Sequence, residues 1–155
     1  MGTVSVGSKI PDFTLPATGD AELGPKNFEG RKLVLYFYPK DNTPGCTAQG
    51  QAFRDHYPAF RKAGAEIVGI SRDSIKSHEN FRAKEAFPFA LASDADETLC
   101  RLFDVLREKT MYGRKVMGIE RSTFLFDEQG VLRREWRKVK VPGHVEEVLE
   151  AVRSL

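Results

Sequence analysis

Two continuous apolar runs, Leu33–Tyr38 and Ala65–Ser71, are the strongest pattern along the chain. Both are rich in β-favouring residues, which is typical of strands buried on both faces. Between them, Pro44–Lys62 carries aromatic side chains at helical spacing, and Pro58 inside this segment predicts a kink or a break. Two buried strands joined by a helix form a crossover unit, so we expect the strands to be parallel.

Smaller elements surround this unit. The first thirty or so residues are rich in Gly, Pro and Asp and predict an N-terminal arm packed on the main fold, with a short strand at Asp12–Leu15. We expect helices over Ser74–Lys84 and over Asp94–Phe103, the second opening with Asp94 and Glu97 at capping-box spacing.

The last third of the chain predicts a hairpin and a helix. Thr123–Phe126 and Val131–Trp136 flank the turn residues 127–130, which is the pattern of a β-hairpin. Residues 145–152 carry an apolar stripe typical of an amphipathic helix. The Arg107–Arg121 stretch is rich in Lys and Arg; we interpret it as a solvated loop, with a wall of the active site or a docking surface as alternatives.

The order strand, helix, strand, hairpin, helix predicts an α/β chain with a thioredoxin-like fold, an N-terminal extension and a central mixed sheet flanked by helices. A length of 155 residues predicts a single domain spanning residues 1–155.

Composition excludes several classes of function. The chain is 41% hydrophobic and 30% charged, and its net charge of +2 comes from 24 basic and 22 acidic residues. This balance gives no sign of nucleic-acid binding. No apolar run is long enough to cross a membrane, and the first nine residues lack a hydrophobic signal core. We therefore expect a cytoplasmic protein with neither a nucleic-acid nor a membrane partner.

Two cysteines, Cys46 and Cys100, are the only ones in the chain. They form neither a disulfide framework nor a C-x-x-C motif, so we expect two free thiols in a reducing compartment. The three histidines are scattered, and no set of about four zinc ligands is apparent. We expect no metal and no cofactor.

The sequence around Cys46 predicts an activated thiol. Taking Thr43 as the N-cap of the helix puts Pro44 at the first position, where its missing N–H costs nothing. Gly45 follows and is small enough to let a substrate approach the backbone. Cys46 then lies in the first turn, where free amides and the helix dipole favour a thiolate.

Ionisation alone does not make a fast catalyst. An ordinary thiol with a pKa near ~8.5 is a few per cent ionised at neutral pH, so complete ionisation adds at most about thirtyfold, or roughly 2 kcal/mol. Faster chemistry needs aligned donors that stabilise charge in the transition state. The sequence therefore predicts a nearby arginine and further amides around the substrate.

Several motifs, in order along nearly the whole chain, carry a family resemblance. They are YFYPKDNTPGCT from Tyr36, FRD at Phe53–Asp55, AEIVGIS at Ala65–Ser71, the FxxLSD-like Phe87–Asp94, MYG at Met111–Gly113 and GIERSTFLFD at Gly118–Asp127. With them the chain resembles the Q-type peroxiredoxins, the bacterioferritin comigratory protein group. The resemblance implies a thiol peroxidase that reduces hydrogen peroxide and organic hydroperoxides.

The resemblance also implies a role for each site residue. Cys46 attacks a peroxide oxygen and becomes a sulfenic acid, while Thr43 hydrogen-bonds the thiolate and the incoming peroxide. Pro39 shields the pocket from water, and Arg121 stabilises the thiolate and polarises the O–O bond. The amides of Gly45 and Cys46 steady the developing oxyanion. The substrate-binding residues that it implies are Pro44 and Gly45.

The chain departs from the fuller family pattern in its resolving thiol. Where many relatives have a cysteine five residues after Cys46, this chain has Gln51, and Ser74–Lys84 contains none. Gln49 replaces the usual acidic residue three positions after the nucleophile. The resemblance then implies one-cysteine chemistry, with thioredoxin, glutaredoxin or glutathione as the external reductant, in a protein that we expect to be a monomer.

Plainer interpretations stay open for four of these residues. Cys100 is either a small core residue, which we favour, or a distant resolving thiol whose use requires local unfolding. Thr43 can be an N-cap alone, and Pro39 can simply end a strand. Arg121 can be a surface ion-pair partner, although its place before an apolar strand predicts a position at the end of the sheet.

Rival functions lack their motifs. A cysteine phosphatase needs C-x5-R, and Ala52 fills the arginine position here. A thioredoxin-type oxidoreductase needs C-x-x-C. A redox sensor or holdase built on the same fold stays as the alternative, and a peroxide assay distinguishes it from an enzyme.

Overall fold

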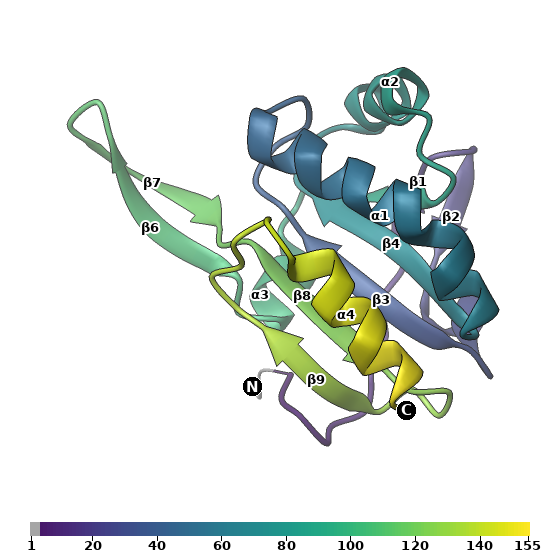
Figure 1. The fold of residues 1–155 in the computed structure, drawn as a ribbon. Coiled ribbons are helices and arrows are strands. Elements are labelled where there is room, and N and C mark those ends of the chain that lie inside the picture. Colours follow the sequence, from purple (N-terminus) through teal and green to yellow (C-terminus); the bar gives the residue numbers. More distant parts are fainter. Residues whose placement is uncertain (1–3) are drawn as a thin grey trace.

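A seven-stranded mixed sheet forms the centre of the computed structural model, which describes residues 4–155 (Figure 1). The strand order is β2-β1-β5-β4-β3-β8-β9. The strands are β1 Leu15–Ala17, β2 Ala21–Leu23, β3 Lys32–Phe37, β4 Ala65–Ser71, β5 Ala90–Ser93, β8 Ser122–Phe126 and β9 Leu132–Trp136. Residues 1–3 of the predicted arm and of the predicted domain lie outside the described residues.

Helices cover the two faces of the sheet unequally. Their bounds are η1 Pro25–Phe28, α1 Pro44–Lys62, α2 Ile75–Glu85, α3 Thr98–Leu102 and α4 His144–Arg153. In Figure 1, α1, α2 and α4 lie on one face and α3 lies behind the sheet. Two further strands, β6 Leu106–Met111 and β7 Arg114–Ile119, pair only with each other and project from the body as a hairpin.

The predicted crossover unit is confirmed. β3 and β4 are parallel, with Leu35 opposite Val68, and α1 connects them. β8 runs antiparallel to β3 on its other side, with Ser122 opposite Phe37. The start of β8 therefore lies beside the end of β3, which is where α1 begins.

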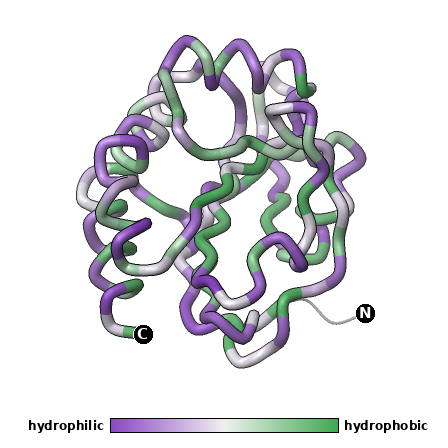
Figure 2. Tube along the Cα trace, turned by 90° about the vertical axis from the view of Figure 1, so that its right-hand side faces the viewer, coloured by the Kyte–Doolittle hydropathy of each residue, from purple (hydrophilic) through white to green (hydrophobic). Residues whose placement is uncertain are grey.

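The alternation of side chains along β3 divides the interior into two apolar clusters. Leu33, Leu35 and Phe37 face the cluster that contains α3, whereas Val34 and Tyr36 face the cluster under α1, α2 and α4. All five are almost completely buried, and burial of each apolar side chain contributes roughly 1.5–3 kcal/mol. Figure 2 shows the hydrophobic positions concentrated in the central strands.

Local sequence explains where the helices begin. α1 opens with Pro44 at its first position and continues to Lys62 through Pro58, so the predicted break does not occur. The hydroxyl of Ser74 accepts a hydrogen bond from the Ser77 amide at 3.2 Å and caps α2. The apolar stripe of α4 is buried, as predicted from residues 145–152.

Three predicted elements are wrong: one helix and one strand in their extent, and the Lys/Arg-rich stretch in its type. The helix predicted over Asp94–Phe103 is the five-residue α3, and the capping box is absent because Glu97 adopts a left-handed φ of 66°. Asp94 instead accepts hydrogen bonds from the amides of Leu99 and Cys100, at 3.0 and 2.7 Å. The short strand predicted at Asp12–Leu15 begins only at its last residue.

The Lys/Arg-rich stretch between residues 107 and 121 is a hairpin rather than a loop. Six residue pairs connect its strands, from Leu106 with Ile119 to Met111 with Arg114. Charged side chains on both strands hid this pairing, because they leave no apolar alternation to detect.

In the described part of the chain, no helix is long and apolar enough to cross a membrane.

Candidate active site

Chain topology brings Cys46 and Arg121 together. Cys46 is the third residue of α1, which begins just beyond the end of β3, and its side chain is buried. Arg121 immediately precedes β8, the antiparallel neighbour of β3. The sequence prediction that Arg121 lies at the end of the sheet is therefore confirmed.

The Arg121 guanidinium contacts the cysteine sulfur and a second residue of α1. Its Nη2 donates to Cys46 Sγ at 3.5 Å, and its Nη1 donates to Gln49 Oε1 at 2.6 Å. Gln49 is fully buried, and its Nε2 has no partner among the described residues. The two contacts fix the plane of the guanidinium and hold a positive charge beside the sulfur.

Gly45 leaves the space that the guanidinium occupies. A Cβ at this position would lie 3.1 Å from Arg121 Nη2, closer than ordinary side-chain contacts. Within residues 4–155, the amides of Gly45 and Cys46 donate to no protein acceptor, since the first helical bond runs from the Thr47 amide to the Thr43 carbonyl at 2.8 Å. Two free donors and a guanidinium thus face the same region, which suits an anion.

Thr43 has the N-cap backbone conformation, but its side chain does not cap the helix. The hydroxyl donates to the Lys40 carbonyl at 2.8 Å, and no hydrogen bond joins it to Cys46. The predicted contact between the hydroxyl and the thiolate is thus not present in this structure. Pro39 is half-buried in the same loop, and Pro44 is exposed at the first helical position.

An aromatic wall backs the sulfur. The Tyr36 ring stacks on Phe53 at 4.5 Å and on Tyr38 at 5.5 Å between centroids. Burial raises the pKa of the Tyr36 phenol well above its ordinary value, and negative charge on Cys46 and on Asp41 adds to this effect. Tyr36 therefore stays neutral in the apolar cluster that also contains Cys46.

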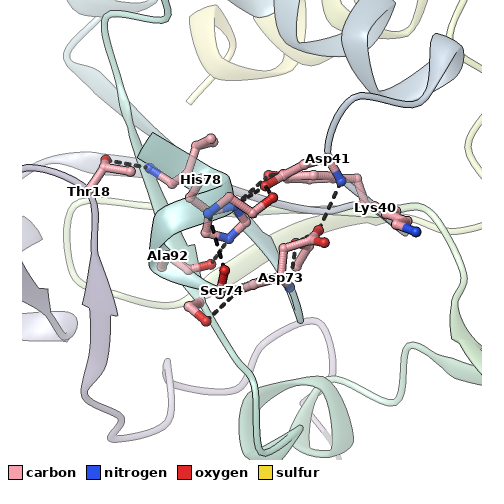
Figure 3. Close-up of polar contacts among 12 residues, drawn as sticks. Thr18, Lys40, Asp41, Asp73, Ser74, His78 and Ala92 are labelled. Atoms are coloured by element: carbon pink, nitrogen blue, oxygen red, sulfur yellow. Dashed lines mark hydrogen bonds and ion pairs between the residues drawn. The ribbon is translucent and has the colours of Figure 1, made fainter. Parts of the chain in front are cut away.

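A buried polar cluster ties the loop before α1 to α2. Asp41 Oδ2 lies 2.7 Å from His78 Nδ1 and accepts a hydrogen bond from Ser77 Oγ at 2.8 Å. Asp41 Oδ1 accepts one from Tyr38 at 2.6 Å. Figure 3 shows His78 between Asp41 and the Ala92 carbonyl. Sequence analysis missed this cluster, although Asp41 lies within the YFYPKDNTPGC motif.

The same cluster contains three residues of types that bind metal ions. Ligand atoms of Asp41, Asp73 and His78 lie within 4.8 Å of one another. Both oxygens of Asp41 already accept hydrogen bonds from Tyr38 and Ser77. Donors from the protein thus already use the Asp41 oxygens that a cation would need.

Cys100 lies on the other side of the sheet from Cys46. It is fully buried in the cluster around α3, whereas Cys46 belongs to the cluster under α1. Burial raises the pKa of the Cys100 thiol well above its ordinary value, and the Asp94 carboxylate raises it further. The surroundings of Cys100 match the favoured interpretation, a small core residue with an unreactive thiol.

Gln49 is a second site residue whose role the sequence left undefined. Its place three residues after Cys46 puts it on the same face of α1, and this spacing was the available signal. Its partner, however, comes from a position 72 residues away, which helical periodicity cannot supply.

Comparison with known proteins agrees with the geometry of the site. A family model described as the AhpC/TSA family matches residues 6–135. Peroxiredoxin Bcp of Xanthomonas campestris pv. campestris is 54% identical over 143 residues, covering 92% of this chain and 89% of that protein. Peroxiredoxin Bcp of Bacillus subtilis is 43% identical over 153 residues, covering 99% and 98%.

Solved structures agree over the same extent. Peroxiredoxin Q of Xanthomonas campestris has a TM-score of 0.90 at 50% identity and covers 99% of this chain and 97% of its own. A cysteine-to-serine mutant of PrxQ from Xylella fastidiosa has a TM-score of 0.93 at 44% identity, with coverage of 99% and 98%. These matches confirm the thioredoxin-like fold. The chain belongs to the AhpC/TSA family and, within it, to the Q-type peroxiredoxins, which are thiol peroxidases.

Proposed function

We propose that Cys46 is the residue through which this peroxiredoxin reduces hydrogen peroxide and organic hydroperoxides. The observation that carries the proposal is the position of its sulfur, 3.5 Å from Arg121 Nη2 at the start of a helix. A solved relative from Xanthomonas campestris is described by its alkyl peroxide reduction activity. That activity supports organic hydroperoxides as one substrate class.

The first step follows from the charges around the sulfur. The Cys46 thiolate attacks the terminal peroxide oxygen, an S–O bond forms and the O–O bond breaks, which leaves a cysteine sulfenic acid. The departing alkoxide or hydroxide takes up a proton and leaves as an alcohol or water. Negative charge thus moves from sulfur toward the leaving oxygen, and Arg121 and the free amides of Gly45 and Cys46 stabilise it there.

Thr43, Pro39 and Pro44 complete the proposed site. A rotation of the Thr43 hydroxyl away from the Lys40 carbonyl lets it donate to a bound peroxide. Pro39 lies in the loop before Thr43, and Pro44 begins the helix directly after it. Neither proline has a backbone N–H that competes for the substrate. Each of these roles rests on the position of the residue beside Cys46.

Regeneration by an external thiol is the second part of the proposal. One thiol attacks the sulfenic acid, giving a mixed disulfide and water, and a second thiol releases Cys46 and leaves as a disulfide. Thioredoxin, glutaredoxin and glutathione are the candidate reductants. Burial of Cys100 on the opposite face of the sheet supports this one-cysteine route.

The α1–α2 contact supports the same route. Gln51, at the position where many relatives have a resolving cysteine, donates to Glu85 Oε1 at 2.8 Å, and Arg54 donates to the Glu85 carbonyl at 2.8 Å. These hydrogen bonds connect α1 to α2 at the position where this chain, with Gln51 instead of a cysteine, cannot form a disulfide. We further propose that residues 1–155 act as one domain and as a monomer, in a reducing cytoplasm where both free thiols persist.

Mass spectrometry after one equivalent of hydrogen peroxide tests this proposal. We expect one added oxygen on Cys46, trapped by a sulfenic-acid reagent, and an unmodified Cys100. An intramolecular Cys46–Cys100 disulfide contradicts the one-cysteine route, and a cross-linked dimer contradicts the monomer.

A further inference from the structure

Both ring nitrogens of His78 face oxygen atoms. Nδ1 lies 2.7 Å from Asp41 Oδ2, and Nε2 lies 3.0 Å from the Ala92 carbonyl oxygen (Figure 3). A backbone carbonyl only accepts, so Nε2 carries a proton. A neutral imidazole has no second N–H, so the contact with Asp41 holds one further proton.

The surroundings place that proton on His78. Asp41 already accepts hydrogen bonds from Tyr38 at 2.6 Å and from Ser77 at 2.8 Å, and these two donors favour the ionised carboxylate even before His78 is considered. Burial raises the pKa of Tyr38 well above its ordinary value, and the neighbouring Asp41 carboxylate adds to this, so Tyr38 remains a donor. Asp73 is a further charged group at the cluster. Asp41 and His78 are then a buried ion pair with 1% and 0% of their side chains exposed.

The pair connects α2 to the loop that delivers Cys46. Asp41 lies between the end of β3 and the start of α1. Its backbone amide donates to Asp73 Oδ2 at 2.9 Å, so its side chain and its main chain are both held. The next residue, Asn42, has a left-handed φ of 63°, a conformation that asparagine adopts more readily than most residues and that turns the chain toward α1.

We propose that Asp41 and His78 are positioning residues for the peroxide reaction. This proposal rests on the function proposed above. The pair donates or accepts no hydrogen bond at the sulfur; it anchors the turn from which α1 starts, and thereby aims the Gly45 and Cys46 amides. A displacement near 1 Å costs about a hundredfold in rate, so small movements of this loop are sufficient.

Two substitutions of His78 test the proposal with matched chemistry. His78→Asn keeps an N–H near the Nδ1 position for Asp41, whereas His78→Leu removes it and leaves the carboxylate without its partner. We expect His78→Leu to lower the rate constant with hydrogen peroxide by about tenfold or more, and His78→Asn to stay within about threefold of the unsubstituted protein. His56→Gln, a change to a partly buried histidine of α1 outside the cluster, is the control.

A second reagent separates positioning from general loss of structure. Iodoacetamide needs a thiolate but no aligned amides, so its rate with Cys46 should change by less than about threefold in His78→Leu. Equal changes in the peroxide and iodoacetamide rates, or an unchanged peroxide rate, overturn the proposal. If the unsubstituted protein itself reacts with peroxide no faster than free cysteine, the proposed function fails instead.

Nitrogen-15 NMR of the unsubstituted protein reports on the pair independently of activity. We expect two protonated ring nitrogens on His78 at neutral pH, and only one in Asp41→Asn, whose amide fills the same space and donates to Nδ1. One protonated nitrogen in the unsubstituted protein overturns the ion pair. Should His78→Leu fail to fold, Asp41→Asn carries the kinetic test, because its amide nitrogen replaces the oxygen that accepts from both Ser77 and His78. A severalfold loss of peroxide rate with an unchanged iodoacetamide rate supports positioning, and any other result opposes it.

Discussion

Arg121 Nη2 lies 3.5 Å from Cys46 Sγ, although 75 positions separate the two residues in the chain. The contact arises because β8 lies antiparallel to β3, so the residue before one strand meets the helix that follows the other. The guanidinium is shared between this sulfur and Gln49. The planar guanidinium thus bridges Cys46 and Gln49, which lie three residues apart on α1.

Arg121→Lys tests whether this planar group is required. A lysine ammonium is a point charge and cannot donate to Gln49 and to the sulfur in the same fixed geometry. We expect the rate constant of Cys46 with peroxide to fall by about a hundredfold or more, the cost of removing one aligned donor. Stopped-flow fluorescence measures it. A loss below threefold shows that charge alone is sufficient.

Two glycines of α1 separate activity from stability. In Gly45→Ala, the new methyl group lies against Arg121 Nη2, so we expect a loss of about tenfold in peroxide rate with an unchanged melting temperature. In Gly50→Ala, the methyl group overlaps the buried Phe87 ring, and we expect a loss of about 1–3 kcal/mol in stability. Chemical denaturation and peroxide kinetics on both variants should give opposite patterns; the same pattern in both contradicts the packing argument.

Cys100→Ser should leave catalysis intact and weaken the fold. The thiol is fully buried in an apolar cluster beside the Asp94 carboxylate, and burial of a more polar hydroxyl there costs up to about 1–3 kcal/mol. Peroxide turnover with an external thiol reductant should stay within about twofold of the unsubstituted protein. Loss of turnover at a temperature where the variant is folded makes Cys100 the resolving thiol.

His144 makes stability depend on pH. Burial lowers its pKa from 6.5 to about 4, Glu147 opposes this, and Arg121 adds to it. Below pH 6.5 the unfolded chain binds a proton that the folded protein refuses until about pH 4, so stability is lost as the pH falls through this window. The loss is on the order of 2–3 kcal/mol.

His144→Gln removes this titration. The glutamine can keep a hydrogen bond to Thr123, whose hydroxyl lies 2.8 Å from His144 Nε2. We expect a smaller decline in unfolding free energy between pH 6.5 and pH 4 for the variant than for the unsubstituted protein. Urea denaturation across that range measures the difference, and parallel curves contradict a buried neutral imidazole.

The parts of the fold that sequence predicted are those with a strong local signal. Continuous apolar runs defined β3 and β4, and the turn at residues 127–130 defined the hairpin of β8 and β9. The β6–β7 hairpin gave no such signal, since runs of charged side chains at residues 107–109 and 114–115 interrupt any apolar alternation. β5 was missed because its four residues are too short a run to separate from a loop.

The same distinction applies to the site. The helix-start position of Cys46 follows from Thr43 and Pro44, which act locally. The family resemblance singled out Arg121 among many arginines. The partners Gln49 and His78 depend on contacts between distant segments, 72 and 37 positions apart, which no local pattern reveals. The Thr43 hydroxyl was misplaced because the Lys40 carbonyl competes for it.

The rate of the first reaction step tests the central claim most directly. Reduced protein is mixed with hydrogen peroxide at neutral pH, and the loss of the Cys46 thiol is followed, with Cys46→Ser as the blank and Cys100→Ser as the control. Stabilisation of both thiolate and transition state predicts a rate constant at least about a thousandfold above that of free cysteine, retained in Cys100→Ser. A rate constant equal to that of free cysteine contradicts the account.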